Sequence, residues 1–185
     1  MSLGLDREHL SALWQRQWPL GPPLAHELRA AYSERWVRFH SLPGSKRYLE
    51  TEDEYAVVLD RSNTVLEELF AGTDVYVVTL AWSSEPNGPQ RPTRRREVHP
   101  DGFPWMTIAN DADPDPEFHT CTHLYADLRP WPRGSIDEIL REVAHDVLSG
   151  VLITDAGLQR IHHPYDGCGP HPDDSRRARR TPEPS

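Results

Sequence analysis

An unbroken run of β-branched, aliphatic and aromatic residues from Val75 to Trp82 limits the possible folds more than any other feature of this chain. A run of this length without polar alternation is typical of a strand that is covered on both faces. The sequence therefore predicts that this segment is a central strand. With 185 residues, one domain with a sizeable core of its own is expected.

Helices are predicted where apolar residues recur at helical spacing, over residues 5–17, 24–32, 51–70 and 135–150. Thr51 and Glu54 form a capping-box pattern at the start of the third helix, and Ser135 and Glu138 repeat that pattern at the start of the fourth. In this pattern the two side chains satisfy backbone N–H groups that the first helical turn leaves unpaired. Proline-rich segments separate the helices from the strands.

Further strands are predicted at residues 36–40, 103–108 and 118–128, and as a hairpin over residues 151–162. Residues 83–100 are rich in proline and are predicted to be a long loop. The resulting order is α-α-β-α-β-β-β-α-β-β, which favours an α+β fold with helices packed on a largely antiparallel or mixed sheet. We expect one domain over residues 1–169 and a disordered Pro/Arg-rich tail over residues 170–185.

The charge composition limits the possible partners. The chain has a formal net charge of −9, so general binding to nucleic acid or to anionic membranes would require a local basic patch. The run Arg94, Arg95 and Arg96 is the one candidate, and a solvated surface is the favoured interpretation of it. The N-terminus has no apolar signal-peptide core, and no apolar segment approaches the length of a membrane span. We therefore expect a soluble cytoplasmic protein with no nucleic-acid or membrane partner.

A basic loop follows the predicted strand at residues 36–40. Lys46, the only lysine in the chain, lies there with Arg47 and Tyr48, and Arg38 lies in the preceding strand. Cations and a hydroxyl donor in one loop are suited to holding a phosphate or a carboxylate. The favoured alternative is that these charges are solvated or pair loosely with the acidic residues at the start of the next helix.

The segment from His162 to Gly167 is a second candidate. A histidine close to Asp166 would form an acid–base pair, because a carboxylate raises imidazole basicity and fixes the tautomer. The favoured alternative is a strand-ending turn, in which Pro164 sets φ and Asp166 bonds local backbone groups. His163 and Tyr165 lie within this segment and are candidate residues in both interpretations.

A metal site is the third possibility. His119, Cys121 and His123 alternate on one face of a predicted strand, and His99 or His162 would have to complete a zinc site. No second ligand pair occurs at a standard spacing, so a mixed polar face is favoured. We expect neither a metal nor a cofactor.

Three segments of the chain, at residues 37–48, 60–66 and 161–167, resemble a bacterial family known as a domain of unknown function. The resemblance implies that the basic loop, Arg61 with Asn63, and the turn with Tyr165 and Asp166 belong to one recurring arrangement. It brings no activity, cofactor or catalytic residue. The chain departs from the family pattern after Gly167, where an apolar strand is expected, and we interpret residues 168–185 as a divergent or frame-shifted ending.

Two functions are compatible with these features. The favoured hypothesis is a non-catalytic binding domain, immunity-like or regulatory, whose partner is another protein. The acidic composition supports it, and so would surface positions for Trp82, Trp105 or Trp131. The alternative is an enzyme acting on a small anionic substrate, with Lys46 and Arg47 holding the anion and a His/Asp pair transferring the proton.

Overall fold

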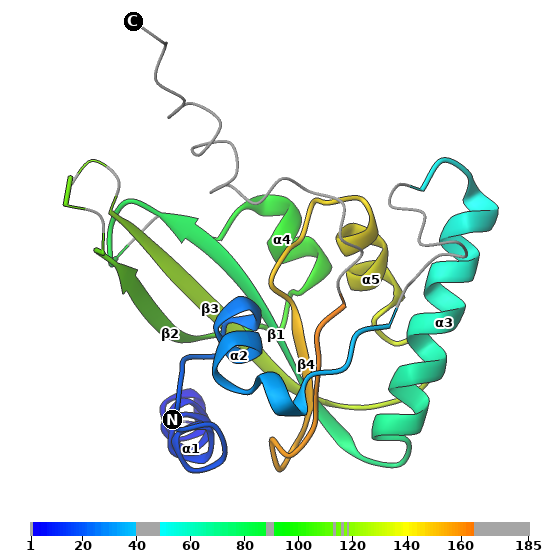
Figure 1. The fold of residues 1–185 in the computed structure, drawn as a ribbon, viewed down its shortest axis with the longest axis horizontal. Helices are drawn as coiled ribbons and strands as arrows, with labels where there is room; N and C mark the ends of the chain where they lie inside the picture. The colour runs from blue at the N-terminus through cyan, green and yellow to red at the C-terminus, as the bar shows by residue number, and fades with distance from the viewer. Residues whose placement is uncertain are drawn as a thin grey trace, which may run out of the picture.

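The computed structural model describes residues 2–39, 49–87, 91–112, 114–115, 117 and 119–164. Within these residues the chain forms an α+β fold built on a five-stranded antiparallel sheet with the strand order β2-β3-β1-β4-β5 (Figure 1). The fold class expected from the sequence is confirmed. The elements are α1 (Ser2–Gln17), α2 (Ala25–Ala31), the 3₁₀ helix η1 (Ser33–Arg35), α3 (Glu52–Phe70), β1 (Asp74–Ser83), α4 (Thr93–Val98), β2 (Phe103–Asn110), β3 (Thr120–Pro130), α5 (Asp137–Ala144), β4 (Leu152–Asp155) and β5 (Ile161–His162).

Strand β1 occupies the middle of the sheet, as its apolar run predicts. It pairs with β3 along its whole length and with β4 over Val75–Val78. Because successive side chains point to opposite faces of a strand, β1 supplies two cores at once. Tyr76, Val78 and Leu80 are buried on one face, whereas Val75 and Val77 are buried on the other.

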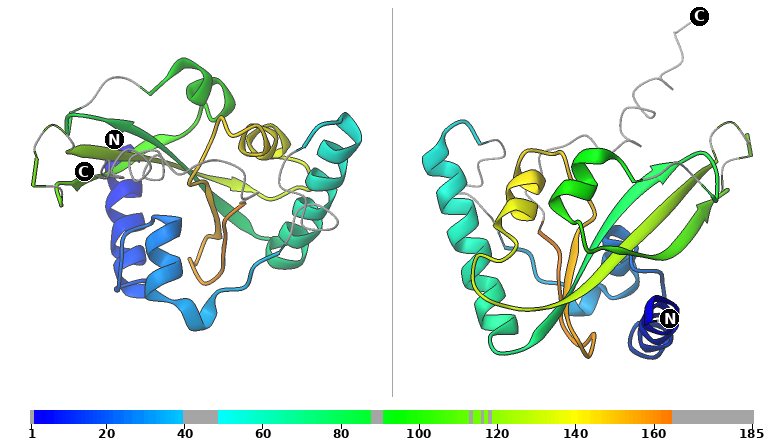
Figure 2. Two further views of the ribbon diagram at one scale, coloured as in Figure 1. Left: turned by 45° about the horizontal axis from the view of Figure 1, so that its top comes forward. Right: turned by 180° about the vertical axis from the view of Figure 1, so that it is seen from behind.

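The helices form a layer on each face of the sheet (Figure 2). Buried residues of α1 and α2 belong to the first core, and buried residues of α3 and α5, together with Val98 of α4, belong to the second. The two N-terminal helices therefore cover one face of the sheet. The result is a three-layer arrangement with the sheet in the middle.

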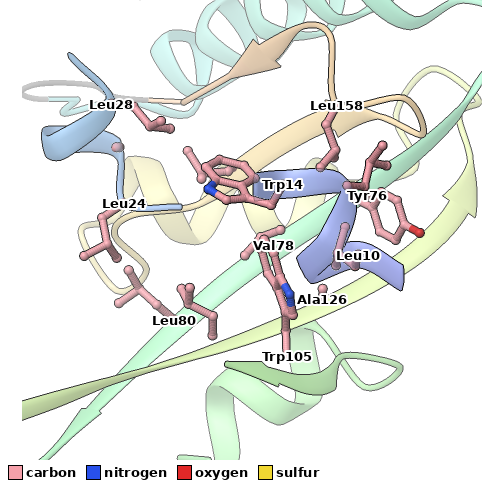
Figure 3. Packing of buried hydrophobic residues seen from close by; sticks show 14 residues of the cluster. Leu10, Trp14, Leu24, Leu28, Tyr76, Val78, Leu80, Trp105, Ala126 and Leu158 are labelled. Carbon is pink, nitrogen blue, oxygen red and sulfur yellow. The ribbon is translucent and has the colours of Figure 1, made fainter. Parts of the chain in front are cut away.

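Tryptophan packing holds α1 against the sheet (Figure 3). The Trp14 ring lies edge-on to the Trp105 ring with 5.7 Å between ring centroids, and Trp105 donates a 3.0 Å hydrogen bond from Nε1 to Ser11 Oγ. Trp105 and Trp131 are 1% and 7% exposed, so the idea that either lies at the surface is wrong. Trp82, at 45% exposure, does lie there.

Helix α3 begins as its capping box predicts. The Glu54 backbone N–H donates to Thr51 Oγ1 over 3.3 Å, while the Glu54 carboxylate accepts from the Glu50 backbone N–H over 2.7 Å. The second predicted capping box is wrong, because α5 starts at Asp137 with no side-chain cap and ends at Ala144. The Ser135 backbone N–H instead donates to the Pro132 carbonyl in a preceding turn.

The strand predicted at residues 36–40 does not form over its described part. Residues 36–39 have no regular secondary structure, and His40 lies outside the described residues. Val37 and Phe39, which share the apolar face of the pattern, are 71% and 60% exposed. Their alternation therefore does not reflect burial against the sheet.

The proline-rich segment at residues 83–100 contains helix α4, which the sequence pattern did not predict. Arg94 of this helix forms ion pairs with Glu142 and with Glu138, the latter at 3.4 Å, and both acceptors lie on α5. Arg95 donates to the Leu80 carbonyl of β1, beyond the part of β1 that pairs with β4. Contacts with distant elements thus stabilise a six-residue helix that is too short to be stable alone.

Along this part of β1, the guanidinium group of Arg95 donates to a backbone carbonyl that a neighbouring strand would otherwise bind. It also donates to the Val147 carbonyl over 3.4 Å and lies 5.1 Å from the centre of the Trp82 ring. Burial lowers the pKa of Arg95 from its ordinary value, so its contacts with the carbonyl oxygens compensate for lost hydration.

We expect Arg95→Ala to lower the free energy of unfolding by about 2 kcal/mol, because a buried carbonyl loses a charged donor. Urea unfolding would measure this loss. The matched control is Arg96→Ala, at an exposed position of the same helix, for which a change below about 0.5 kcal/mol is expected. Equal effects of the two substitutions would contradict the role assigned to Arg95.

Among the residues that the structure describes, no helix has both the length and the apolar character needed to cross a membrane.

Candidate functional site

A pocket of about 460 Å³ lies at the β5 edge of the sheet. The segment that follows α2 runs past this edge toward α3 (Figure 1), and the same course is visible from a second direction (Figure 2). Most of the described residues that line the pocket belong to the segment from α2 to Phe39, to α3, to α5 and to the end of the β4–β5 hairpin. The volume falls in the range typical of small-molecule sites.

The charged residues of the pocket are all basic. Five arginines and two histidines belong to its described lining, which contains no aspartate or glutamate: Arg29, Arg35, Arg38, Arg61, Arg160, His162 and His163. This concentration of positive charge is unexpected in a chain with a formal net charge of −9. Guanidinium groups present several N–H donors in a planar fork that suits carboxylate, sulfonate and phosphate oxygens.

The remaining lining is mostly apolar and includes aromatic rings. Trp18 and Tyr32 pack edge to face with 4.9 Å between their centroids. Hydrogen bonds fix both residues, because Trp18 Nε1 donates to the Leu158 carbonyl over 2.7 Å and the Tyr32 hydroxyl accepts from the Leu20 backbone N–H over 2.9 Å. Val58 and Val65 of α3 and Leu140 of α5 complete the described apolar wall with their neighbours.

His162 and His163 lie at the end of the β4–β5 hairpin. Nδ1 of His163 makes a 2.8 Å hydrogen bond with the Val151 carbonyl, so it carries the proton and donates. Burial, with a smaller contribution from the neighbouring His163, lowers the pKa of His162 to about 4. Burial also lowers the pKa of His163, against the effect of its bond to Val151. Both imidazoles are therefore neutral near pH 7.

Four of the residues singled out in the sequence meet in this pocket, namely Arg38, Arg61, His162 and His163. They come from the segment after η1, from the middle of α3 and from the end of β5, which are far apart along the chain. The other candidates from the basic loop and the terminal turn lie outside the described residues: Lys46, Arg47, Tyr48, Tyr165 and Asp166.

Asn63 has a different position from Arg61, although the two lie in one sequence motif. Two residues along a helix correspond to a rotation of about 200° around its axis, so the side chains leave opposite sides of α3. Asn63 is 5% exposed, and its Nδ2 donates to Asp137 Oδ1 over 2.6 Å. Its Oδ1 accepts from the Gly134 backbone N–H over 3.1 Å. Asn63 thus joins α3 to the start of α5.

A second polar cluster, which the sequence did not predict, lies between the sheet and α4. Nε2 of His99 donates to the Asp127 carboxylate, and Nδ1 of His99 is 2.9 Å from Thr79 Oγ1. Arg129 binds the same carboxylate through Nε. Burial raises the pKa of Asp127, but hydrogen bonds from His99 and Arg129 outweigh that effect and hold the pKa below its ordinary value.

This hydroxyl–imidazole–carboxylate arrangement has a structural role. Thr79 and His99 are 1% and 0% exposed, so a substrate has no access to the hydroxyl or to the imidazole. Arg91 is also buried in this region, with its guanidinium carbon 4.7 Å from the centre of the Tyr125 ring. The cluster ties the turn after α4 to strands β1 and β3.

Two of the three residues considered as metal ligands, Cys121 and His123, have other positions or partners. Cys121 is buried as a free thiol. His123 contacts Ser83 Oγ over 2.7 Å through Nε2 and Thr107 Oγ1 over 3.0 Å through Nδ1. His99, one of the two suggested additional ligands, is bound to Asp127, and the other, His162, lines the pocket. Within the described residues no group of three or more histidine, cysteine, aspartate or glutamate side chains is arranged to hold a metal ion.

Comparison with protein families assigns residues 24–170 to a family described as a domain of unknown function, DUF3885. This match covers most of the chain, and the protein belongs to that family. No curated protein and no solved structure matches the chain. The family carries no assigned activity, so a function has to be inferred from the pocket itself.

Proposed function

We propose that this protein is a binding domain whose pocket takes a small organic anion with an apolar part. The observation that carries the proposal is the lining of the pocket, in which five arginines accompany an apolar wall and no carboxylate occurs among the described residues. A neutral apolar ligand would make no ionic contact with these guanidinium groups. An inorganic anion would leave the aromatic wall uncovered, so a ligand with both parts fits best.

The sequence favoured another protein as the partner, and that idea stays a prediction. A concave site of this volume supports a small molecule as the occupant more directly than a protein surface. The acidic composition of the chain supports specificity, because ligands carrying positive charge are attracted elsewhere on the protein.

An enzyme acting on a small anion is the second candidate, and the observation that favours it is the presence of two histidines in the pocket. A general acid or base works best when its pKa is close to the operating pH. The pKa of His162, lowered to about 4, is far from neutrality in the free protein. Binding without chemistry is therefore the better-supported proposal.

The binding test uses naphthalene-2-sulfonate, which combines a fixed anionic group with an apolar ring system. We expect saturable binding by isothermal titration calorimetry, and much weaker binding of the neutral analogue naphthalene-2-sulfonamide. We expect Arg61→Gln and Arg160→Gln each to weaken sulfonate binding about fivefold or more, because each removes a charged donor.

The matched control is Arg16→Gln, which removes an exposed arginine from α1 outside the pocket. It should leave the affinity unchanged within about twofold, since exposed charges at a distance are screened by salt. Equal binding of the sulfonate and the sulfonamide, or equal losses in all three variants, would show that the arginines of the pocket do not select an anion.

A further inference from the structure

One nitrogen in the wall of the pocket lacks a hydrogen-bond partner. His162 belongs to β5, where its backbone pairs with Ile153, and it is one of the residues that line the pocket. Nε2 of His162 is buried and has no hydrogen-bond partner among the described residues. Buried polar groups are nearly always paired, so this atom indicates a missing partner.

Burial opposes protonation of His162, and the adjacent His163 adds a smaller unfavourable contribution. Among the residues that the structure describes, the pocket lining contributes basic or neutral groups only: Arg29 from α2, Arg35 from η1, Arg38 from the following segment, Arg61 from α3, Arg160 and His163 from the hairpin, and apolar Leu140, Val143 and Ala144 from α5. His26 of α2 adds a further unfavourable contribution at His163. An imidazolium at this buried position would lose hydration and would have no acidic partner among the described residues of the lining.

A bound anion favours protonation of His162, because it brings a negative charge and hydrogen-bond acceptors into the pocket. We propose that His162 is the residue that senses the ligand: Nε2 hydrogen-bonds to the bound anion, and the imidazole takes up one proton from the solvent as the anion enters. This inference rests on the proposed anion-binding function. No bond forms or breaks other than the N–H bond, and the proton comes from the buffer.

The coupling predicts the direction of the pH dependence. In the free protein the pKa of His162 is about 4, and the anion moves it back toward its ordinary value. Protonation then favours the complex over the free protein, so affinity rises as pH falls. If the pKa in the complex returns to about 6.5, affinity increases about tenfold between about pH 7.5 and about pH 5.5.

The test measures binding of naphthalene-2-sulfonate by the full chain at these two pH values. A sulfonate is suitable because its own charge does not change in this range, which leaves the protein as the source of any pH dependence. We expect the tenfold gain in the unmodified protein and less than about a twofold gain in His162→Asn, which cannot take up a proton there.

His163→Gln is the matched control, because it removes the adjacent histidine and keeps His162. It should retain most of the pH dependence. Calorimetry of the unmodified protein near pH 5.5, in buffers with different ionisation enthalpies, should show uptake of about one proton per ligand. This last measurement needs no substitution, so it holds even if His162→Asn fails to fold.

The outcomes separate the inference from the function on which it rests. Saturable binding without pH dependence, or with a pH dependence that persists in His162→Asn, would overturn the role of His162 and leave the anion-binding function in place. A lack of saturable sulfonate binding at both pH values would overturn the proposed function together with the inference.

Discussion

Replacing Asp127 by alanine is expected to lower the free energy of unfolding by about 3–5 kcal/mol, which exceeds the loss expected for Arg95→Ala. The carboxylate of Asp127 binds both the fully buried His99 and Arg129. Its removal leaves an imidazole and a guanidinium group without their acceptor under the sheet. Urea unfolding monitored by circular dichroism would measure the change.

Asp111→Ala is the control, because Asp111 is exposed and follows strand β2. A change within about 0.5 kcal/mol is expected there. Asp127→Asn should fall between the two, since the amide oxygen still accepts a hydrogen bond but carries no charge. A loss below about 1 kcal/mol for Asp127→Ala would contradict the structural role of the cluster.

The same carboxylate predicts sensitivity to acid. The pKa of Asp127 is lower in the folded protein than in the unfolded chain, so its contribution to stability is present above the unfolded value and is lost as pH falls through the folded value. His162 acts in the same direction, because the unfolded chain takes up a proton near its ordinary pKa before the folded protein does. Asp127→Asn should flatten the acidic part of the stability curve.

Gly150→Ala is expected to lower the free energy of unfolding by about 3 kcal/mol, through two additive causes. Gly150 has φ of +66°, which a side chain rarely adopts. A Cβ atom built there would overlap Leu80 Cδ2, so the side chain of a core residue in β1 would have to move.

Gly72→Ala separates the two causes. Gly72 has a similar φ of +73°, but no atom beyond its chain neighbours lies within 4 Å of a Cβ built there. It should cost about 1 kcal/mol, the effect of the backbone conformation alone. Equal thermal unfolding temperatures for the two variants would show that the segment around Gly150 moves to accommodate the methyl group.

Local patterns in the sequence account for much of the fold. The apolar run of β1 and the capping box at Thr51 are properties of short segments, and both have the predicted form. The hairpin of β4 and β5 also forms, but its second strand is confined to Ile161–His162 and the connection is longer than the predicted three-residue turn. Helix α4 was missed because contacts from Arg94 and Arg95 to distant elements stabilise it. The strand predicted at residues 36–40 shows the reverse error, since an alternating pattern needs a partner edge to become a strand.

The candidate site was predictable only in part. Arg38, Arg61 and His163 were singled out from motifs, and the fold brings them to one pocket. Arg29 and Arg160 also line it, but nothing in their local sequence distinguishes them from other surface arginines. The cluster of His99 and Asp127 was missed for a related reason, because residues 28 positions apart in the sequence become partners only when the turn after α4 packs against β3.

The most direct test of the central claim is to map where an organic anion binds. Backbone amide chemical shifts of isotope-labelled protein would be followed by NMR during titration with naphthalene-2-sulfonate. We expect saturable shifts at Arg61 in α3 and at residues 160–163, and little change around α4 on the far side of α5. Shifts concentrated around Arg94 and Arg95, or shifts that do not saturate, would contradict the assignment of the arginine-lined pocket as the binding site.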